Sequence, residues 1–127
     1  MSAIDGESTT REVAHAYVAA WTAGDAAAVQ RLLADDVSFE CNLGRPTDPP
    51  RAVETLVRLA GALDTVTLLA ETYTAGRAVL VYDCVTRQPS GTIRTVEFLE
   101  IVGDRVREAR RVYDLAAVAR LLPDLVS

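Results

Sequence analysis

The chain has 127 residues, of which 50% are hydrophobic and 24% charged, and this length and composition predict one globular domain over residues 1–127. The 18 acidic residues outnumber the 13 basic ones and give a formal net charge of -5, which speaks against binding to nucleic acid or to an anionic membrane surface. All 13 basic residues are arginine, so a lysine Schiff base and a phosphate loop with its lysine are excluded.

Histidine and cysteine are scarce. A zinc site takes about three or four ligands, and one His and two Cys could complete one only with carboxylates. The chain also lacks a Gly-rich phosphate loop, so we expect no metal and no cofactor. No apolar run reaches the roughly 18 residues of a membrane span, and the first residues do not resemble a signal peptide. We therefore expect a cytoplasmic protein that binds neither membrane nor nucleic acid.

The first predicted element is a helix that begins near Thr9 or Thr10, either of which can cap it. Val13, Tyr17 and Trp21 recur at helical spacing and fall on one side of it. This side is expected to face the core.

Gly24 ends this helix, and Asp25 can cap a second one that runs to about residue 34. Residues 37–41 alternate between apolar and polar side chains, as in a short strand. A loop over residues 42–50 leads to a third helix.

The residue pattern in the second half of the chain is typical of β-strands. We expect strands at 66–74, 78–87, 92–102 and 105–113, and a final helix between 115 and 125. Three helices followed by a meander of long strands predict an α+β fold with helices packed on one face of a sheet.

This layout resembles the nuclear transport factor 2-like superfamily, and within it the ketosteroid isomerase and SnoaL-like polyketide cyclase branch. The features that carry the match are the first helix, the Gly24-Asp25 junction, the second helix, Ala34-Asp35-Asp36-Val37, the strand and the Gly-Pro loop. The resemblance covers roughly residues 9 to 114. It implies a cone-shaped half-barrel, in which a curved mixed sheet wraps around the N-terminal helices and encloses an internal pocket.

The resemblance also implies candidate catalytic residues. Tyr17 stands where ketosteroid isomerases have an oxyanion-hole tyrosine, and Glu97 stands where they have a protonated aspartic acid. The aspartate that shuttles the proton is replaced by Cys41. Limonene epoxide hydrolases and SnoaL-like cyclases have an acid in the last strand, where this chain has Arg111. Neither family's set of acids is complete.

Strand alternation predicts which side chains share the pocket with Glu97, Tyr17 and Arg111. The expected substrate-binding residues are Trp21, Phe39, Cys41, Leu80, Tyr82, Cys84, Thr95 and Tyr113. Glu40, Asp83 and Arg110 are expected to point outward. Both thiols are expected to stay reduced.

Glu97 is open to two chemical interpretations and one structural interpretation. A protonated Glu97 can donate to a substrate oxygen, as in the oxyanion hole of ketosteroid isomerase, which is an established example of this effect. An ionised Glu97 can act as a general base. Alternatively, Glu97 and Arg111 form an ion pair that merely closes the pocket.

Two functions follow from these interpretations. The first is a cofactor-free acid–base enzyme, an isomerase, cyclase, dehydratase or epoxide-opening hydrolase, that acts on an apolar small molecule. The alternative is a non-catalytic small-ligand-binding or scaffold protein of the same fold. Under either function we expect a homodimer formed through the outer face of the sheet, which carries Val79, Val81, Val85 and Val96.

Overall fold

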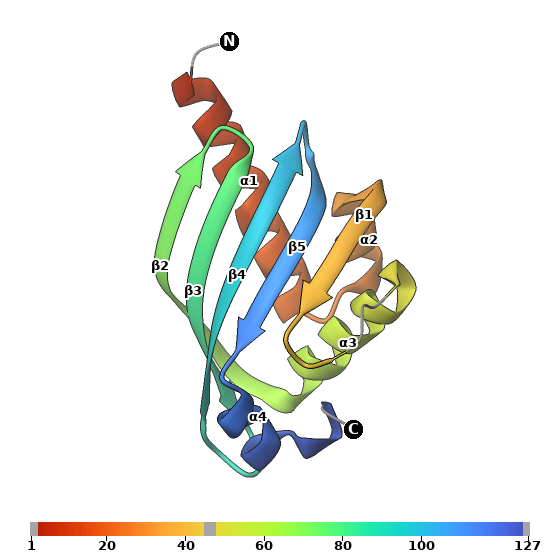
Figure 1. Cartoon of the computed structure of the whole chain (residues 1–127), viewed down its shortest axis with the longest axis vertical. Coiled ribbons are helices and arrows are strands. Elements are labelled where there is room, and N and C mark those ends of the chain that lie inside the picture. The colour runs from red at the N-terminus through yellow and green to blue at the C-terminus, as the bar shows by residue number, and fades with distance from the viewer. Residues whose placement is uncertain (1–2, 45–47, 126–127) are drawn as a thin grey trace.

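The computed structural model describes residues 3–44 and 48–125. It contains a curved sheet of five strands with four α-helices, most of which lie on its concave side (Figure 1). The helices are α1 (Ala3–Thr22), α2 (Ala26–Leu32), α3 (Pro49–Ala62) and α4 (Leu115–Leu121), followed by a short 3-10 turn, Pro123–Leu125. The strands are β1 (Leu33–Cys41), β2 (Leu63–Thr74), β3 (Arg77–Thr86), β4 (Thr92–Val102) and β5 (Arg105–Tyr113).

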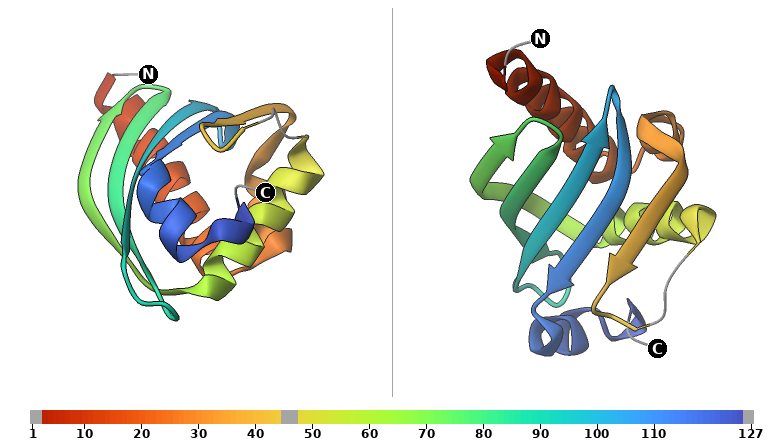
Figure 2. Two further views of the ribbon diagram at one scale, coloured as in Figure 1. Left: turned by 60° about the horizontal axis from the view of Figure 1, so that its bottom comes forward. Right: turned by 45° about the horizontal axis from the view of Figure 1, so that its top comes forward.

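The strand order is β1-β5-β4-β3-β2. β1 runs parallel to β5, and the other neighbouring pairs are antiparallel. Helix α1 crosses the hollow of the sheet, α3 lies near the β1 edge, and α4 follows β5 at one end (Figure 2). The expected α+β class and curved mixed sheet around N-terminal helices are confirmed.

Three helices begin at an aspartate that caps them. The side chains of Asp25, Asp48 and Asp114 each accept a hydrogen bond from the backbone N–H three residues later, at 3.0 to 3.2 Å. Such a cap stabilises a helix start by about 1 kcal/mol. Gly24, in the junction before Asp25, has a φ of 70°, which glycine adopts without steric cost.

The predicted start of the first helix at Thr9 or Thr10 is wrong, because α1 already begins at Ala3. Thr10 does not cap the helix. Its hydroxyl donates to the backbone oxygen of Gly6 at 2.8 Å, one turn earlier, and accepts from the backbone N–H of Gly76 at 2.8 Å. Thr10 therefore lies inside the helix and ties it to the turn between β2 and β3.

The predicted bounds of the second helix and first strand are also wrong. α2 ends at Leu32, and β1 begins at Leu33. Leu33 is paired with Val106, and the register then shifts before Ser38 pairs with Glu108. A bulge of this kind breaks the alternation of side chains between the two faces, and that alternation is the pattern by which a strand is recognised in sequence. β2 likewise begins at Leu63, earlier than the predicted residue 66, next to another register shift.

The core lies between α1 and the concave face of the sheet. Its largest fully buried side chains are Trp21 and Tyr17 from α1 and Tyr82 from β3. No helix within residues 3–44 or 48–125 combines the length and apolar character needed to cross a membrane.

Candidate functional site

A buried carboxylate, Glu97 on β4, occupies the middle of the cone. Its Oε2 accepts hydrogen bonds from the Tyr17 hydroxyl at 3.0 Å and from Arg111 Nε at 2.7 Å. Its Oε1 accepts from the Tyr82 hydroxyl at 2.7 Å and from Arg111 Nη2 at 3.2 Å. Each oxygen thus has two donors, and Glu97 has no exposed surface.

Strand register brings these side chains together. Glu97 pairs with Leu80 on β3 and with Arg111 on β5, so the carboxylate and the guanidinium lie directly across neighbouring strands. Thr95, two residues away on the same face of β4, pairs with Tyr82 and Tyr113. The predicted inward positions of these strands are therefore inward in the structure.

Arg111 links this network to a third tyrosine. Its Nη1 donates to the Tyr113 hydroxyl at 3.0 Å, and its guanidinium lies over the Trp21 ring at 4.3 Å from the centroid. Burial alone would lower the pKa of Arg111, but the Glu97 carboxylate and the three neighbouring tyrosines together outweigh this effect and hold the pKa well above its usual value. The guanidinium is therefore charged, and Glu97 is its counter-ion.

The tyrosines of the network remain neutral at pH 7. Burial and the Glu97 carboxylate raise the pKa of Tyr17 well above its usual value. Burial also raises the pKa of Tyr82 well above that value, although Arg111 opposes the shift. The pKa of Tyr113 is raised by burial and lowered in part by Arg111. All three hydroxyls can therefore act as hydrogen-bond donors.

These contacts restrict what Glu97 can do. An ionised carboxylate is an acceptor with room for about four hydrogen bonds. Glu97 already has four donors, so it has little capacity left to take a proton from a substrate. Tyr113 differs, because its hydroxyl oxygen accepts from Arg111 while its own proton has no acceptor among the described residues.

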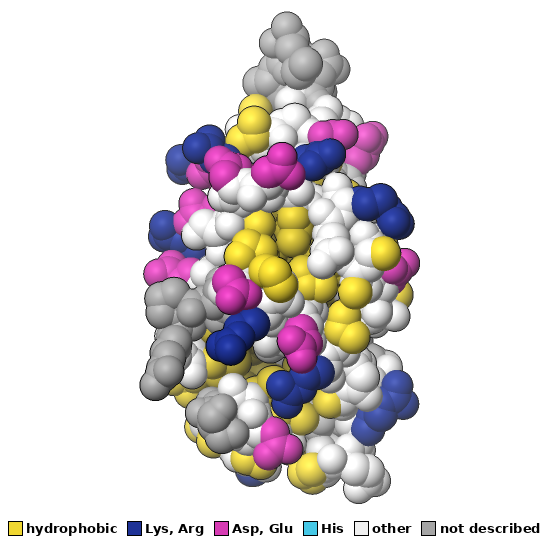
Figure 3. Space-filling view, turned by 90° about the vertical axis from the view of Figure 1, so that its right-hand side faces the viewer, with side chains coloured by type: hydrophobic (Ala, Val, Ile, Leu, Met, Phe, Trp, Pro, Cys, Tyr) yellow, Lys and Arg dark blue, Asp and Glu magenta, His cyan; other side chains and the backbone are white. Residues whose placement is uncertain are grey.

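A small cavity of about 50 Å³ lies between β1, α3 and β5. Phe39, Cys41, Leu56, Arg111 and Tyr113 are among the side chains that line it. It is large enough for a few water molecules. Apolar side chains gather between charged ones on the side of the molecule that bears β1 and α3 (Figure 3).

The other predicted pocket residues do not line this cavity. Trp21, Leu80, Cys84 and Thr95 have no exposed surface and lie in the packed interior, as do Tyr17 and Glu97. Tyr82 borders a separate hollow of about 240 Å³, between α1, the end of α3 and β2. The wide internal pocket expected from the sequence is therefore filled by aromatic rings and the Glu97 network.

The two cysteines lie in different surroundings. Neither is in a disulfide. Cys41 is partly exposed and borders the cavity, whereas Cys84 is buried, and burial raises the pKa of its thiol to about 11.

Asn42 is a site residue that the sequence reasoning missed. Its side chain donates to the backbone oxygen of Tyr113 and accepts from the backbone N–H of Tyr113, both at 2.9 Å. This amide extends the pairing of β1 with β5 by one residue and fixes the position of Tyr113. The sequence did show an asparagine directly after a predicted strand. Its partner, Tyr113, lies 71 positions away in the sequence, so the contact could not be recognised from neighbouring residues.

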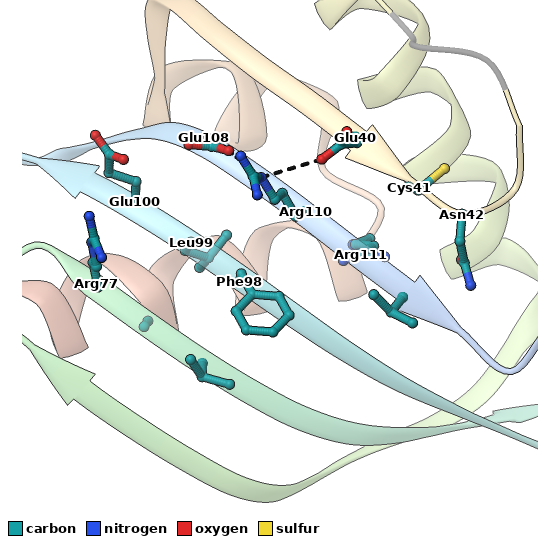
Figure 4. Close-up of a pocket in the computed structure, with 13 residues that line it drawn as sticks. Glu40, Cys41, Asn42, Arg77, Phe98, Leu99, Glu100, Glu108, Arg110 and Arg111 are labelled. Carbon is teal, nitrogen blue, oxygen red and sulfur yellow. Dashed lines mark hydrogen bonds and ion pairs between the residues drawn. The ribbon is translucent and has the colours of Figure 1, made fainter.

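A broad groove of about 740 Å³ crosses the outer face of the sheet, which is the face turned away from α1. Phe98 stands in it, and the ion pair between Arg110 and Glu40, at 3.3 Å, lies at the β1 side (Figure 4). Arg77 and Glu100 lie at another part of its rim. The outward orientation predicted for Glu40 and Arg110 agrees with this placement.

No protein-family model matches the sequence, and no curated protein does. Similar solved structures do exist. A protein from Kribbella flavida DSM 17836 is 24% identical with a TM-score of 0.76, over 89% of this chain and 94% of that one. A candidate SnoaL-like polyketide cyclase from Jannaschia sp. CCS1 is 14% identical with a TM-score of 0.78, over 91% and 92%. A nuclear transport factor 2-like protein from Burkholderia xenovorans LB400 is 16% identical with a TM-score of 0.69, over 95% and 98%.

These similarities show the fold. The chain has the nuclear transport factor 2-like fold, in the form seen in SnoaL-like proteins, and the resemblance expected from the sequence is confirmed at this level. Identities of 13% to 24% among the similar structures identify no reaction, since one fold supports many chemistries.

Proposed function

We propose that this protein binds a mostly apolar small molecule at the cavity between β1, α3 and β5, and that Tyr113 donates a hydrogen bond to an oxygen atom of this molecule. The observation that carries the proposal is Tyr113, which lines the cavity; its hydroxyl accepts from Arg111, and its proton has no acceptor among residues 3–44 and 48–125. An apolar cavity with a few polar groups is the usual form of a small-molecule site. Since this cavity has about 50 Å³ and is open on one side, we propose that only the oxygen-bearing end of the ligand enters it.

Glu97 supports this binding site indirectly. It neutralises Arg111 and fixes two of the guanidinium nitrogens, so the third nitrogen, Nη1, stays directed at the Tyr113 hydroxyl. The cation polarises that hydroxyl and strengthens it as a donor. Tyr17 and Tyr82 hold the carboxylate in turn. Glu97, Tyr17 and Tyr82 thus pre-organise Tyr113 without touching the ligand.

A cofactor-free acid–base enzyme is the second candidate function. A hydroxyl polarised by a guanidinium can stabilise negative charge that develops on a carbonyl oxygen, as an isomerase or cyclase requires. Tyr113 and Arg111 would carry this role, instead of Glu97 and Tyr17. A dehydratase or epoxide-opening hydrolase would use the same proton donor. A base is still needed, and Glu40 and Cys41 are the other ionisable side chains with exposure at the cavity.

Calorimetric titration with two compounds of the same shape tests the binding proposal. α-Tetralone is a bicyclic ketone, and tetralin is the same skeleton without the oxygen. We expect α-tetralone to bind more tightly, and Tyr113→Phe to weaken it by about tenfold while leaving tetralin unchanged, because one hydrogen bond is lost. Tyr73→Phe is the control, since Tyr73 packs against His15 away from the cavity. If neither compound binds, or if Tyr113→Phe binds α-tetralone like the wild type, the proposal fails.

We also propose that a second copy of the chain covers the outer face of the sheet. Val79, Phe98 and Val112 are exposed there, at 36%, 44% and 47%, and Val81 and Val96 are partly exposed between them. Phe98 and Val112 strengthen the apolar patch beyond the valines expected from the sequence.

The charges around this patch suit a self-complementary contact. Arg77, Glu100 and Glu108 pair across the strands at one end of the patch, and Asp83 and Arg94 form an ion pair at the other end. Each end carries both signs. Each end of a second copy related by a two-fold axis would therefore find a charge of opposite sign within the end that it faces.

A further inference from the structure

We infer that the hollow of about 240 Å³ between α1, the end of α3 and β2 is a second ligand site, and that it takes a small apolar molecule with a protonated amine. This site goes beyond the proposed function, because it shares no lining residue with the cavity at Tyr113. Its volume is that of about eight water molecules in the liquid, which is enough for a small bicyclic amine.

Apolar side chains from three elements form the walls of this hollow. They pack against the core but remain partly exposed, and they are Val18 on α1, Ala60 on α3, and Val66 and Leu68 on β2. Tyr82, which is fully buried, also lines the hollow. A ligand that covers the four partly exposed side chains removes apolar surface from water, and this removal is favourable.

The polar groups of the hollow select a donor with positive charge. Asp64 is an exposed carboxylate that lines it and has no ion pair within the part of the chain that the structure describes. The Thr22 hydroxyl donates its proton to the backbone oxygen of Val18 at 2.7 Å, so its oxygen is left to accept. The Thr65 hydroxyl can accept or donate. No arginine is among the described residues that line the hollow, so an anionic ligand would meet only Asp64 as a charge.

Asp64 lies at a register shift of β2. Leu63 pairs with Thr86 on β3 and Thr65 pairs with Val85, so Asp64 has no partner residue across the strands. A bulge of this kind changes the direction of a side chain and is over-represented next to active sites. The formal net charge of -5 adds a long-range attraction for a cation. An ammonium group at Asp64 with its hydrocarbon part against the apolar walls is the arrangement that satisfies both halves of the hollow.

Calorimetric titration with 2-aminoindane and indane tests this inference. The two compounds share one ring skeleton, and only 2-aminoindane carries an ammonium group at pH 7. We expect Asp64→Asn to weaken 2-aminoindane by about three- to fivefold, as an exposed ion pair predicts, and to leave indane unchanged. Asp104→Asn is the matched control, since it removes the same charge from the turn between β4 and β5, at the opposite end of the sheet from the start of β2.

An NMR spectrum of methyl-labelled wild-type protein locates the bound compound. The aromatic ring of 2-aminoindane shifts the resonances of methyl groups close to it. We therefore expect changes at Val18, Val66 and Leu68, and none at Leu56, which lines the cavity at Tyr113. Tyr113→Phe should bind 2-aminoindane like the wild type, so this site and the proposed function stand or fail separately.

Three results would each overturn the inference. The first is that 2-aminoindane does not bind the wild type. The second is that its methyl shifts appear at Leu56 and not at Val18 and Leu68, which would place it in the other cavity. The third is that Asp64→Asn and Asp104→Asn weaken 2-aminoindane equally, because the attraction would then come from the net charge of the whole protein and not from Asp64.

Discussion

Arg111 holds both carboxylate oxygens of Glu97, with Nε at 2.7 Å from Oε2 and Nη2 at 3.2 Å from Oε1. The two side chains face each other on β4 and β5 and are 0% and 7% exposed. Such an ion pair adds little net stability compared with apolar residues, but removing one partner leaves the other charge buried and uncompensated. The pair therefore makes the interior of the cone sensitive to single substitutions.

Glu97→Gln is predicted to destabilise the protein by about 3–5 kcal/mol. The amide has one acceptor oxygen, and its NH₂ group would face Arg111, which also only donates. This loss is a large share of the roughly 5–15 kcal/mol that stabilises a typical domain. Urea denaturation followed by circular dichroism measures it.

Asp83→Asn is the matched control for this carboxylate-to-amide change. Asp83 pairs with Arg94 on the outer face, where the arginine side chain is 63% exposed, and we expect little change in stability there. A double substitution of Glu97 and Arg111 by Met should recover part of the stability lost in Glu97→Gln, because no charge remains buried. Equal stability of Glu97→Gln and Asp83→Asn would contradict the role given to the ion pair.

All four tyrosines are predicted to keep their protons in the folded protein well above pH 10. Burial is the first cause of the raised pKa in Tyr17, Tyr82 and Tyr113, and burial with Glu71 raises the pKa of Tyr73 to about 12. In the unfolded chain, tyrosine titrates near pH ~10. The stability that these tyrosines confer is thus fully present below pH ~10. It is lost at higher pH, because only the unfolded state releases the protons.

The absorbance of tyrosinate, followed together with circular dichroism, measures this effect. We expect tyrosinate to appear in one cooperative step that coincides with unfolding. Tyr113→Phe serves as a control that removes one tyrosine from the signal. A gradual titration centred near pH ~10, with the secondary structure intact, would show that the rings are accessible to solvent and would contradict their burial.

The fold was predictable because its signals are local. The Gly24-Asp25 junction, the capping aspartate and the alternation of β3, β4 and β5 each occupy a few adjacent residues, and all of them agree with the structure. The same alternation placed Glu97 and Arg111 on the inner face. The start of β1 was missed because its bulge breaks the alternation there.

The packing and the hydrogen bonds of the site were not predictable from the sequence. Which residues point inward follows from alternation, but how completely they fill the cone depends on the size and packing of rings from three separate elements. The four donors on the Glu97 carboxylate become visible only when α1, β3 and β5 are placed around it.

Cys41 and Cys84 are predicted to react with thiol reagents at very different rates. Cys84 is fully buried, and the pKa of its thiol is raised by burial to about 11, so little of the reactive thiolate forms at pH 8. Cys41 is partly exposed at the rim of the cavity. A colorimetric thiol assay of the native protein, purified without reductant, should count one fast thiol, and a second should appear on unfolding.

Cys41→Ala identifies the fast thiol, because the native variant should then show almost no rapid reaction. A total count of two thiols after unfolding also shows that both were reduced. A count of zero, with a peptide linked through both cysteines in the mass spectrum, would demonstrate a disulfide and contradict the structure.

Phe98→Glu is predicted to convert a homodimer into a monomer. Phe98 is 44% exposed in the middle of the apolar patch on the outer sheet face, next to Val79 on β3. A second copy seated on this face would bury the ring, and a carboxylate there would lie in an apolar interface without a partner. Light scattering at micromolar concentration should give twice the chain mass for the wild type and the single chain mass for the variant.

Leu115→Glu is the control, since Leu115 is 45% exposed at the start of α4, where an acidic residue suits the helix. We expect it to remain dimeric. A monomeric wild type would refute the dimer, and a Phe98→Glu variant that stays dimeric would place the interface on another face.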